Sequence, residues 1–198
     1  MPMRHKKHYM TLIIGILLPL ITTALINAGY MNLPKSAAHT NSSTHASALS
    51  FASDTPFQVV KVVDGDTVDI AQDDKSVRVR LIGINSPENV DPRRPVECFG
   101  KEASNHAKEI LSGKTVRIEL DPSQGMYDKY GRLLAYIILQ GGASFNQKMI
   151  AEGYAYEYTY LNPYKYQAEF RQLQNIARTS SRGLWAADTC NGEKNFRE

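Results

Sequence analysis

Two carboxylates separated by a single glycine stand in the segment 63–68, at Asp64 and Asp66. Calcium takes several oxygen ligands in flexible geometry, so a paired carboxylate at a turn is suited to holding this cation. An Asp-Gly pair is also an ordinary hairpin turn, and that structural interpretation applies if no other functional residue accompanies it. Asp66 is therefore a candidate calcium ligand that depends on what the rest of the sequence supplies.

A second chemically capable segment spans residues 80–88. The planar guanidinium of Arg80 can bind two phosphate oxygens at once. Asn85 offers an amide oxygen, and Pro87 ends the strand so that Glu88 projects from a loop, where it could hold and deprotonate water. Taken singly, Arg80 could equally form a surface ion pair and Glu88 could be a solvated loop acid.

The third segment, 128–132, places Lys129 and Tyr130 just before a second guanidinium, that of Arg132. A cation beside an aromatic ring is suited to binding a phosphate and stacking a base. The alternative interpretation is a polar hairpin loop. Together the three segments supply positive charge for a phosphate, a group that can activate water and a cation site, which phosphodiester hydrolysis requires.

The elements that must position these residues follow from hydrophobic periodicity. Alternating or β-branched runs predict strands at 57–63, 67–70, 77–81, 115–120 and 133–139. Helical spacing predicts helices at 99–111, 144–152 and 165–180. The alternation at 77–81 places Arg78 and Arg80 on one face of their strand. The predicted fold class is α+β, an OB-fold-type β-barrel of five strands with about three packed helices; barrels of this type bind oligonucleotides or oligosaccharides.

The sequence resembles the staphylococcal nuclease (thermonuclease) family over about residues 57–188. Five segments that carry the resemblance occur in the expected order: DGDTV at 64–68, RLIGINSPE at 80–88, FGKEA at 99–103, DKYGRLLAY at 128–136 and GLW at 183–185. The resemblance implies the same small barrel, with a calcium-dependent nuclease activity toward DNA and RNA that leaves 3′-phosphates.

The resemblance also implies roles for individual residues. Asp66 matches the principal calcium carboxylate, and the position of Thr67 contributes a backbone carbonyl to the metal. Arg80 and Arg132 match the arginines that bind the scissile phosphate and stabilise its transition state. Glu88 matches the general base toward the attacking water.

Further substrate-binding positions are less uniform. Lys129 and Tyr130 match positions near the terminal phosphate of a bound nucleotide, and Tyr158 and Tyr160 lie near the base-stacking tyrosines. Asn85 stands where the family often has its second calcium carboxylate. An amide oxygen can still bind calcium but carries no charge, so we expect weaker calcium binding.

The N-terminus has the features of an export signal. Basic residues Arg4, Lys6 and Lys7 precede an uncharged run over 9–30, and removing residues 1–28 takes the net charge from +3 to 0. Electrostatic attraction of a polyanion must therefore come from local charges. We expect residues 1–28 to be a signal peptide or a membrane anchor, 29–54 a flexible linker, 55–190 the nuclease-like domain and 191–198 a tail.

The sequence leaves several alternatives open. Cys98 and Cys190 could form one disulfide in an oxidising compartment or remain separate thiols. The favoured function is an exported, calcium-dependent nuclease acting on DNA and RNA as a monomer, with membrane attachment only if the N-terminal segment is uncleaved. The alternatives are a non-catalytic oligonucleotide-binding barrel and a sugar-binding barrel, and the retention of Asp66, Arg80, Glu88 and Arg132 favours the enzyme.

Overall fold

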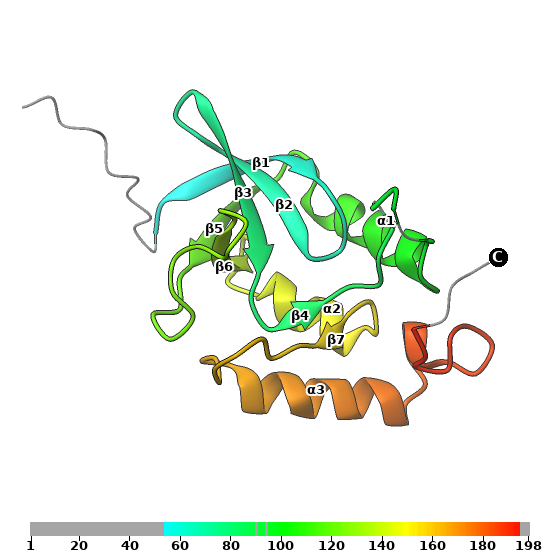
Figure 1. Cartoon of the computed structure of the whole chain (residues 1–198). Coiled ribbons are helices and arrows are strands. Elements are labelled where there is room, and N and C mark those ends of the chain that lie inside the picture. The colour runs from blue at the N-terminus through cyan, green and yellow to red at the C-terminus, as the bar shows by residue number, and fades with distance from the viewer. Residues whose placement is uncertain (1–53, 90, 94, 195–198) are drawn as a thin grey trace, which may run out of the picture. The chain divides into compact units, whose positions relative to one another are not determined.

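The computed structural model describes residues 54–194 except 90 and 94. In this part of the chain, five strands form a closed barrel with neighbours in the order β1-β2-β3-β6-β5 (Figure 1). The barrel strands are β1 (Pro56–Val62), β2 (Thr67–Gln72), β3 (Lys75–Leu81), β5 (Thr115–Glu119) and β6 (Leu133–Ile138). All five predicted strands are present, and their ends lie within two residues of the prediction.

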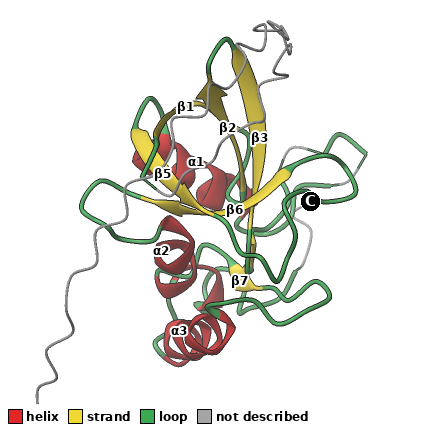
Figure 2. Cartoon of the chain, turned by 90° about the vertical axis from the view of Figure 1, so that its left-hand side faces the viewer, coloured by secondary structure: helices red, strands yellow, loops and turns green. Residues whose placement is uncertain are grey.

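Three α-helices pack around the barrel: α1 (Gly100–Leu111), α2 (Phe145–Ala151) and α3 (Gln167–Thr179). Helix α1 packs against β1, whereas α2 contacts both β6 and α3. Figure 2 shows α2 between the barrel and α3. A short 3-10 helix, η1 (Gly183–Trp185), follows α3. The predicted fold class, a five-stranded barrel with three packed helices, is confirmed.

The alternation in β3 explains how the barrel both closes its core and presents charge. Val79 and Leu81 are fully buried, in keeping with the predicted inward face, while Arg78 and Arg80 project on the other side. Burying a large aliphatic side chain stabilises the fold by about 1.5–3 kcal/mol. The pattern of the core therefore fixes the face on which Arg80 lies, because a one-residue shift in register would bury it.

Parallel pairing of β3 with β6 brings the second and third polar segments together. Arg80 lies opposite Leu134 in this ladder, two residues after Arg132. Parallel neighbours require a crossover connection, and here α1 and β5 lie between the two strands in the sequence. Residues about fifty positions apart thus meet at one end of the barrel.

A second, two-stranded sheet was not predicted. It pairs β4 (Ile84–Asn85) with β7 (Tyr156–Glu157), and Asn85 lies opposite Tyr156. Two-residue strands are too short to show an alternation in the sequence. This pair holds the segment after β3 beside residues 154–160, a segment that contains four tyrosines, and it therefore sets the position of both segments.

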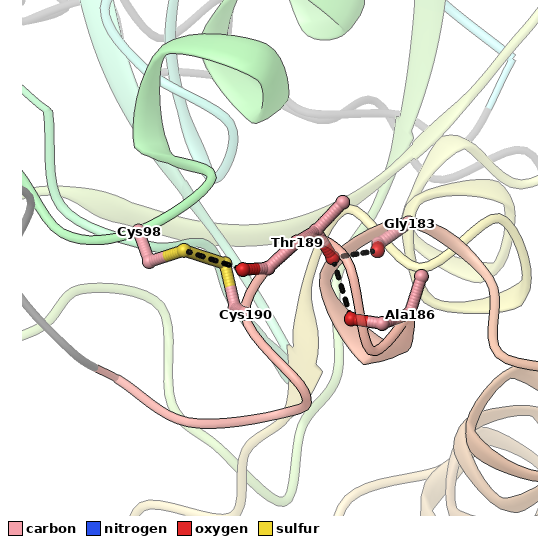
Figure 3. The surroundings of a disulfide bond; sticks show 5 residues. All are labelled: Cys98, Gly183, Ala186, Thr189 and Cys190. Carbon is pink, nitrogen blue, oxygen red and sulfur yellow. Dashed lines mark hydrogen bonds between the residues drawn. A yellow bond between two sulfur atoms is a disulfide. The ribbon is translucent and has the colours of Figure 1, made fainter.

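The two cysteines form a disulfide, which resolves the alternative left open by the sequence. The Cα atoms of Cys98 and Cys190 lie 5.9 Å apart, and the two residues are 92 positions apart in the sequence. Closing a loop of this size restricts the unfolded chain and stabilises the fold by about 4–5 kcal/mol in the chain-entropy account. Figure 3 shows the bond beside the turn that contains Thr189.

The predicted segment 1–28 and nearly all of the predicted linker 29–54 lie outside the described residues, as does the tail beyond residue 194. Within residues 54–194, apart from positions 90 and 94, no helix combines the length and apolar character that crossing a bilayer demands.

Candidate active site

One cleft of about 820 Å³ is lined by all ten residues that the sequence predicted for the site. It lies where β2 and β3 meet β4, next to the loop that precedes β6 and the segment that follows β7. The three polar segments of the sequence therefore contribute to one site, as the prediction required.

The turn between β1 and β2 is pressed against the segment that follows β4. A Cβ on Gly65 would lie only 2.6 Å from the Cβ of Ser86, so a glycine is needed for this close approach. The Asp66 amide donates to Asp64 Oδ1 at 3.0 Å, which fixes the turn. Glycine at this position thus serves the contact with Ser86 and brings both carboxylates to the cleft.

Asp66 is buried, and both of its carboxylate oxygens accept hydrogen bonds from neighbouring donors. Its Oδ1 accepts a hydrogen bond from the Thr67 hydroxyl at 2.9 Å, and its Oδ2 accepts one from the Ser86 amide at 2.9 Å. Arg80 Nη2 lies 3.1 Å from the same Oδ2. These contacts hold the carboxylate in one orientation toward the cleft.

The predicted role of the Thr67 carbonyl does not agree with its hydrogen bonds. This carbonyl accepts from the Val63 amide at 2.9 Å and from the Asp64 amide at 3.2 Å. A carbonyl oxygen has two lone pairs, and both are used here to close the turn. The role that the structure supports for Thr67 is orientation of Asp66 through its hydroxyl, rather than metal binding through its carbonyl.

Asp64, the first carboxylate of the Asp-Gly-Asp turn, also lines the cleft, although no individual role was predicted for it. Burial and the nearby charge of Asp66 raise the pKa of Asp64 to about 7. The Asp-Gly-Asp spacing was the sequence signal for it, since both carboxylates of the turn line the cleft.

Arg80 is held by four acceptors at the end of β3. Its Nη1 donates to the carbonyls of Leu81 and Ile84 at 2.6 and 2.8 Å. Its Nη2 donates to Asn85 Oδ1 at 3.3 Å and pairs with Asp66. A guanidinium fixed in this way loses little conformational entropy when it binds a phosphate.

Glu88 lies on a loop that its own carboxylate organises. Its Oε1 accepts hydrogen bonds from the amides of Asn89 at 2.9 Å and Asp91 at 3.1 Å. The backbone of Glu88 is held by Glu97, because the Glu88 amide donates to Glu97 Oε2 at 3.0 Å and the Glu97 amide donates to the Glu88 carbonyl at 2.8 Å. Glu97 is buried, and no pattern in the sequence indicated this role. A Cβ on Gly100 would lie 2.6 Å from the Glu88 carbonyl, so α1 also packs closely on this loop.

Arg132 is oriented by Asp128 in the loop before β6. Its Nε and Nη2 each lie 2.7 Å from Asp128 Oδ2. Burial raises the pKa of Asp128, but hydrogen bonds from the Arg132 backbone and side chain and from the Tyr130 amide outweigh it, so the pKa lies below its usual value. The Arg132 guanidinium and the Lys129 ammonium lie over the Tyr130 ring, 5.4 and 5.0 Å from its centroid.

The four clustered tyrosines divide into two kinds. Tyr154 stacks on His106 and Tyr156 is buried, so both serve packing. Tyr158 and Tyr160 are 41% and 60% exposed, line the cleft and lie 6.4 Å apart by ring centroids. Exposed rings at the edge of a charged cleft are suited to stacking on bases.

The possible ligands for a cation in the cleft are oxygens only. Within the described part of the chain, no three His, Cys, Asp or Glu side chains converge as a metal site. Asp64 and Asp66 nevertheless line the cleft with the Asn85 amide, whose oxygen lies beside Arg80. A set of carboxylate and amide oxygens without nitrogen or sulfur fits a hard cation such as calcium.

A closed barrel with two fixed guanidinium groups, a loop glutamate and oxygen donors in one cleft holds the kinds of group that hydrolysis of a phosphate diester requires. The family model described as staphylococcal nuclease homologue matches residues 78–187. The chain belongs to the staphylococcal nuclease family, and it is an enzyme of the nuclease class.

Individual relatives agree with this assignment. A thermonuclease of Staphylococcus hyicus is 40% identical over 141 residues, covering 71% of this chain and 82% of that protein. A thermonuclease of Staphylococcus intermedius is 42% identical over 129 residues, covering 65% of this chain and 75% of its own length. An uncharacterized endonuclease of Escherichia coli is 33% identical over 129 residues, covering 65% and 76% respectively.

Proposed function

We propose that this protein is an exported, calcium-dependent nuclease that hydrolyses phosphodiester bonds of DNA and RNA with little sequence preference and leaves 3′-phosphates. The observation that carries the proposal is the presence of Arg80, Arg132 and Glu88 in one cleft with the oxygens of Asp66 and Asn85. Low sequence preference follows because the phosphate is the same at every step of the chain.

The two arginines neutralise the phosphate and the charge that develops on it. Arg80 comes from β3 and Arg132 from the loop before β6, and each is oriented by its own carboxylate, Asp66 or Asp128. Because these ion pairs exist before the substrate binds, the guanidinium groups need little reorganisation in the transition state. Fixed charge of this kind is the largest usual contribution to enzymatic rate.

Glu88 acts as the general base. The amides of Asn89 and Asp91 hold its Oε1, and this fixes the direction of the carboxylate. The carboxylate takes a proton from a water molecule that attacks the phosphorus, and the bond from phosphorus to the 5′-oxygen breaks. General-base catalysis contributes about 10²–10⁴-fold to rate.

Calcium would be held by Asp66 and by the amide oxygen of Asn85, with Asp64 adding negative charge beside them. When bound, it supplies positive charge next to the phosphate. The support for this proposal is the all-oxygen donor set that Asp64, Asp66 and Asn85 present to the cleft.

Export is supported by two independent features. The sequence at 1–28 has basic residues followed by an uncharged run. The Cys98–Cys190 disulfide is of the kind that forms and persists in oxidising compartments outside the cytoplasm.

The test of the activity is digestion of DNA and RNA by the purified full-length protein, with calcium and with a chelator. Glu88→Gln keeps a side-chain oxygen that can accept the hydrogen bond from the Asn89 amide, so the loop should remain folded. We expect kcat to fall by about 10²–10⁴-fold with little change in substrate affinity. Glu109→Gln, which neutralises an exposed acid on α1, is the matched control and should behave as wild type.

Each part of the proposal has its own contradicting result. Absence of cleavage in calcium would refute the nuclease assignment, and cleavage that persists in chelator would refute the metal. If Glu88→Gln mainly weakened binding or lowered the melting temperature, Glu88 would be a structural acid rather than the base.

A further inference from the structure

The segment that follows η1 is folded back on itself. The Thr189 hydroxyl donates to the carbonyls of Gly183 at 2.7 Å and Ala186 at 3.0 Å (Figure 3). The Gly192 amide donates to the Leu184 carbonyl at 2.8 Å. Residues 183–192 are therefore one compact unit.

The disulfide attaches this unit close to the loop that carries Glu88. Cys98 directly follows Glu97, whose carboxylate and amide hold the backbone of Glu88. A small apolar cluster surrounds the attachment and consists of Cys98, Phe99, Tyr156, Leu184 and Cys190. The C-terminal unit is thus fixed to the wall of the site by a covalent bond and by packing.

Lys194, two positions after the end of this unit, lies at the cleft. It is among the cleft-lining residues, and its Nζ lies 4.8 Å from the centroid of the Tyr156 ring. Tyr156 lies opposite Asn85 in the β4–β7 pair, so Lys194 is close to the part of the site that we assign to calcium. Lys194 is four positions after Cys190, and a chain of four residues spans at most about 14 Å.

The balance of charge in the cleft gives this lysine its significance. Six carboxylate residues line the cleft, against four cationic ones. Arg80 and Arg132 are already paired with Asp66 and Asp128. Within the described part of the chain, Lys194 lies over an aromatic ring and has no carboxylate partner. In an acidic cleft, such a cation is available to a polyanionic substrate.

We propose that Lys194 binds a backbone phosphate beside the one held by the two arginines, and that the Cys98–Cys190 disulfide keeps it at the cleft. Lys194 is then a substrate-positioning residue, and the disulfide couples the redox state of the protein to substrate affinity. This inference rests on the proposed nuclease function and adds a contact that none of the ten predicted site residues supplies.

The test compares Lys194→Gln with Lys108→Gln, which removes the same charge from an exposed position on α1. For oxidised full-length protein cleaving DNA, we expect Lys194→Gln to raise KM about three- to fivefold at low salt, as for one exposed ion pair, with kcat nearly unchanged. The slope of log affinity against log salt should become shallower by about 0.7–0.9, which corresponds to one lost phosphate contact. Lys194→Arg should restore both values.

The role of the disulfide is tested by repeating these measurements with Cys98→Ser/Cys190→Ser and with reduced wild-type protein, whose folding is checked by circular dichroism. Both should show the raised KM, and Lys194→Gln should add little to either. A Lys194→Gln protein that matches Lys108→Gln in KM and salt slope would overturn the lysine contact while the nuclease assignment stands. A full effect of Lys194→Gln in the reduced protein would overturn the role of the disulfide. Inactive wild-type protein would overturn both proposals.

Discussion

Asn85→Asp is the substitution that examines the electrostatics of the site most directly. Asn85 Oδ1 lies 3.3 Å from Arg80 Nη2, which itself lies 3.1 Å from Asp66 Oδ2. At an effective dielectric constant of 20, a new charge on residue 85 gains about 5 kcal/mol from Arg80. The new charge lies within about 6.4 Å of Asp66 Oδ2, which is the sum of the two distances. Repulsion between the two carboxylates therefore costs at least about 2.6 kcal/mol.

These opposing terms predict a small effect on the protein without metal. Two further costs offset what remains of the attraction to Arg80: desolvation of the new carboxylate, and its repulsion by the nearby Asp64. We expect the free energy of unfolding in chelator to stay within about 1 kcal/mol of wild type. The larger consequence should appear in calcium, because a charged ligand replaces a neutral one around a divalent ion.

We expect Asn85→Asp to lower the calcium concentration at half-maximal activity by about tenfold or more, which corresponds to about 1.4 kcal/mol of binding free energy. At saturating calcium, the same free energy should raise the melting temperature by about 3–6 °C relative to wild type. Calcium titrations followed by thermal unfolding measure this without reference to catalysis.

Asn105→Asp is the matched control, since it adds the same charge at an exposed position on α1. If Asn85→Asp and Asn105→Asp gave the same calcium dependence in both assays, Asn85 would not face the metal. The assignment of the oxygen donors would then have to be revised.

Two further predictions concern the framework of the site. Burial raises the pKa of Asp121, but hydrogen bonds from the Lys165 amide, Ser123 and the Tyr136 hydroxyl outweigh it, and the pKa lies below its usual value. Its contribution to stability is therefore present above about pH 4 and is lost as the pH falls through the lowered pKa. Asp121→Ala leaves buried donors unpaired and should lower the free energy of unfolding, measured by urea titration, by about 3–4 kcal/mol at pH 7. The loss should be smaller at pH 3, and an equal loss at both pH values would contradict this prediction. Gly65→Ala should force the Asp66 turn away from Ser86, destabilise the protein by about 1–3 kcal/mol and raise the calcium concentration needed for activity. Unchanged thermal unfolding curves and calcium titrations would show instead that the turn accommodates the methyl group.

The local chemistry of the site was predictable from the sequence because it depends on residue type and short spacing. The alternation of Val79 and Leu81 with Arg78 and Arg80 is a property of four consecutive residues, and the strand forms as this pattern requires. The same holds for the Asp-Gly-Asp turn, where a glycine marks a close approach of two segments.

What the sequence could not supply depends on contacts between distant segments. The carbonyl of Thr67 was predicted to bind metal, but the turn that it closes uses both of its lone pairs. The support that Glu97 gives to Glu88, and the pairing of Asn85 with Tyr156, involve strands or loops too short to produce a periodic pattern.

The groups available for catalysis, and the strands and turns that carry them, follow from local patterns in the sequence, because hydrophobic periodicity and turn residues act over a few positions. No local pattern predicts that Arg80 and Arg132 share a cleft, which results from the parallel pairing of β3 and β6 in the folded barrel. The tertiary structure also decides that Cys98 and Cys190 bond and that Lys194 joins the site. The physical reason is that these contacts join residues about 50 to 110 positions apart, and their free energy depends on the packing of the whole barrel and not on any local run of residues.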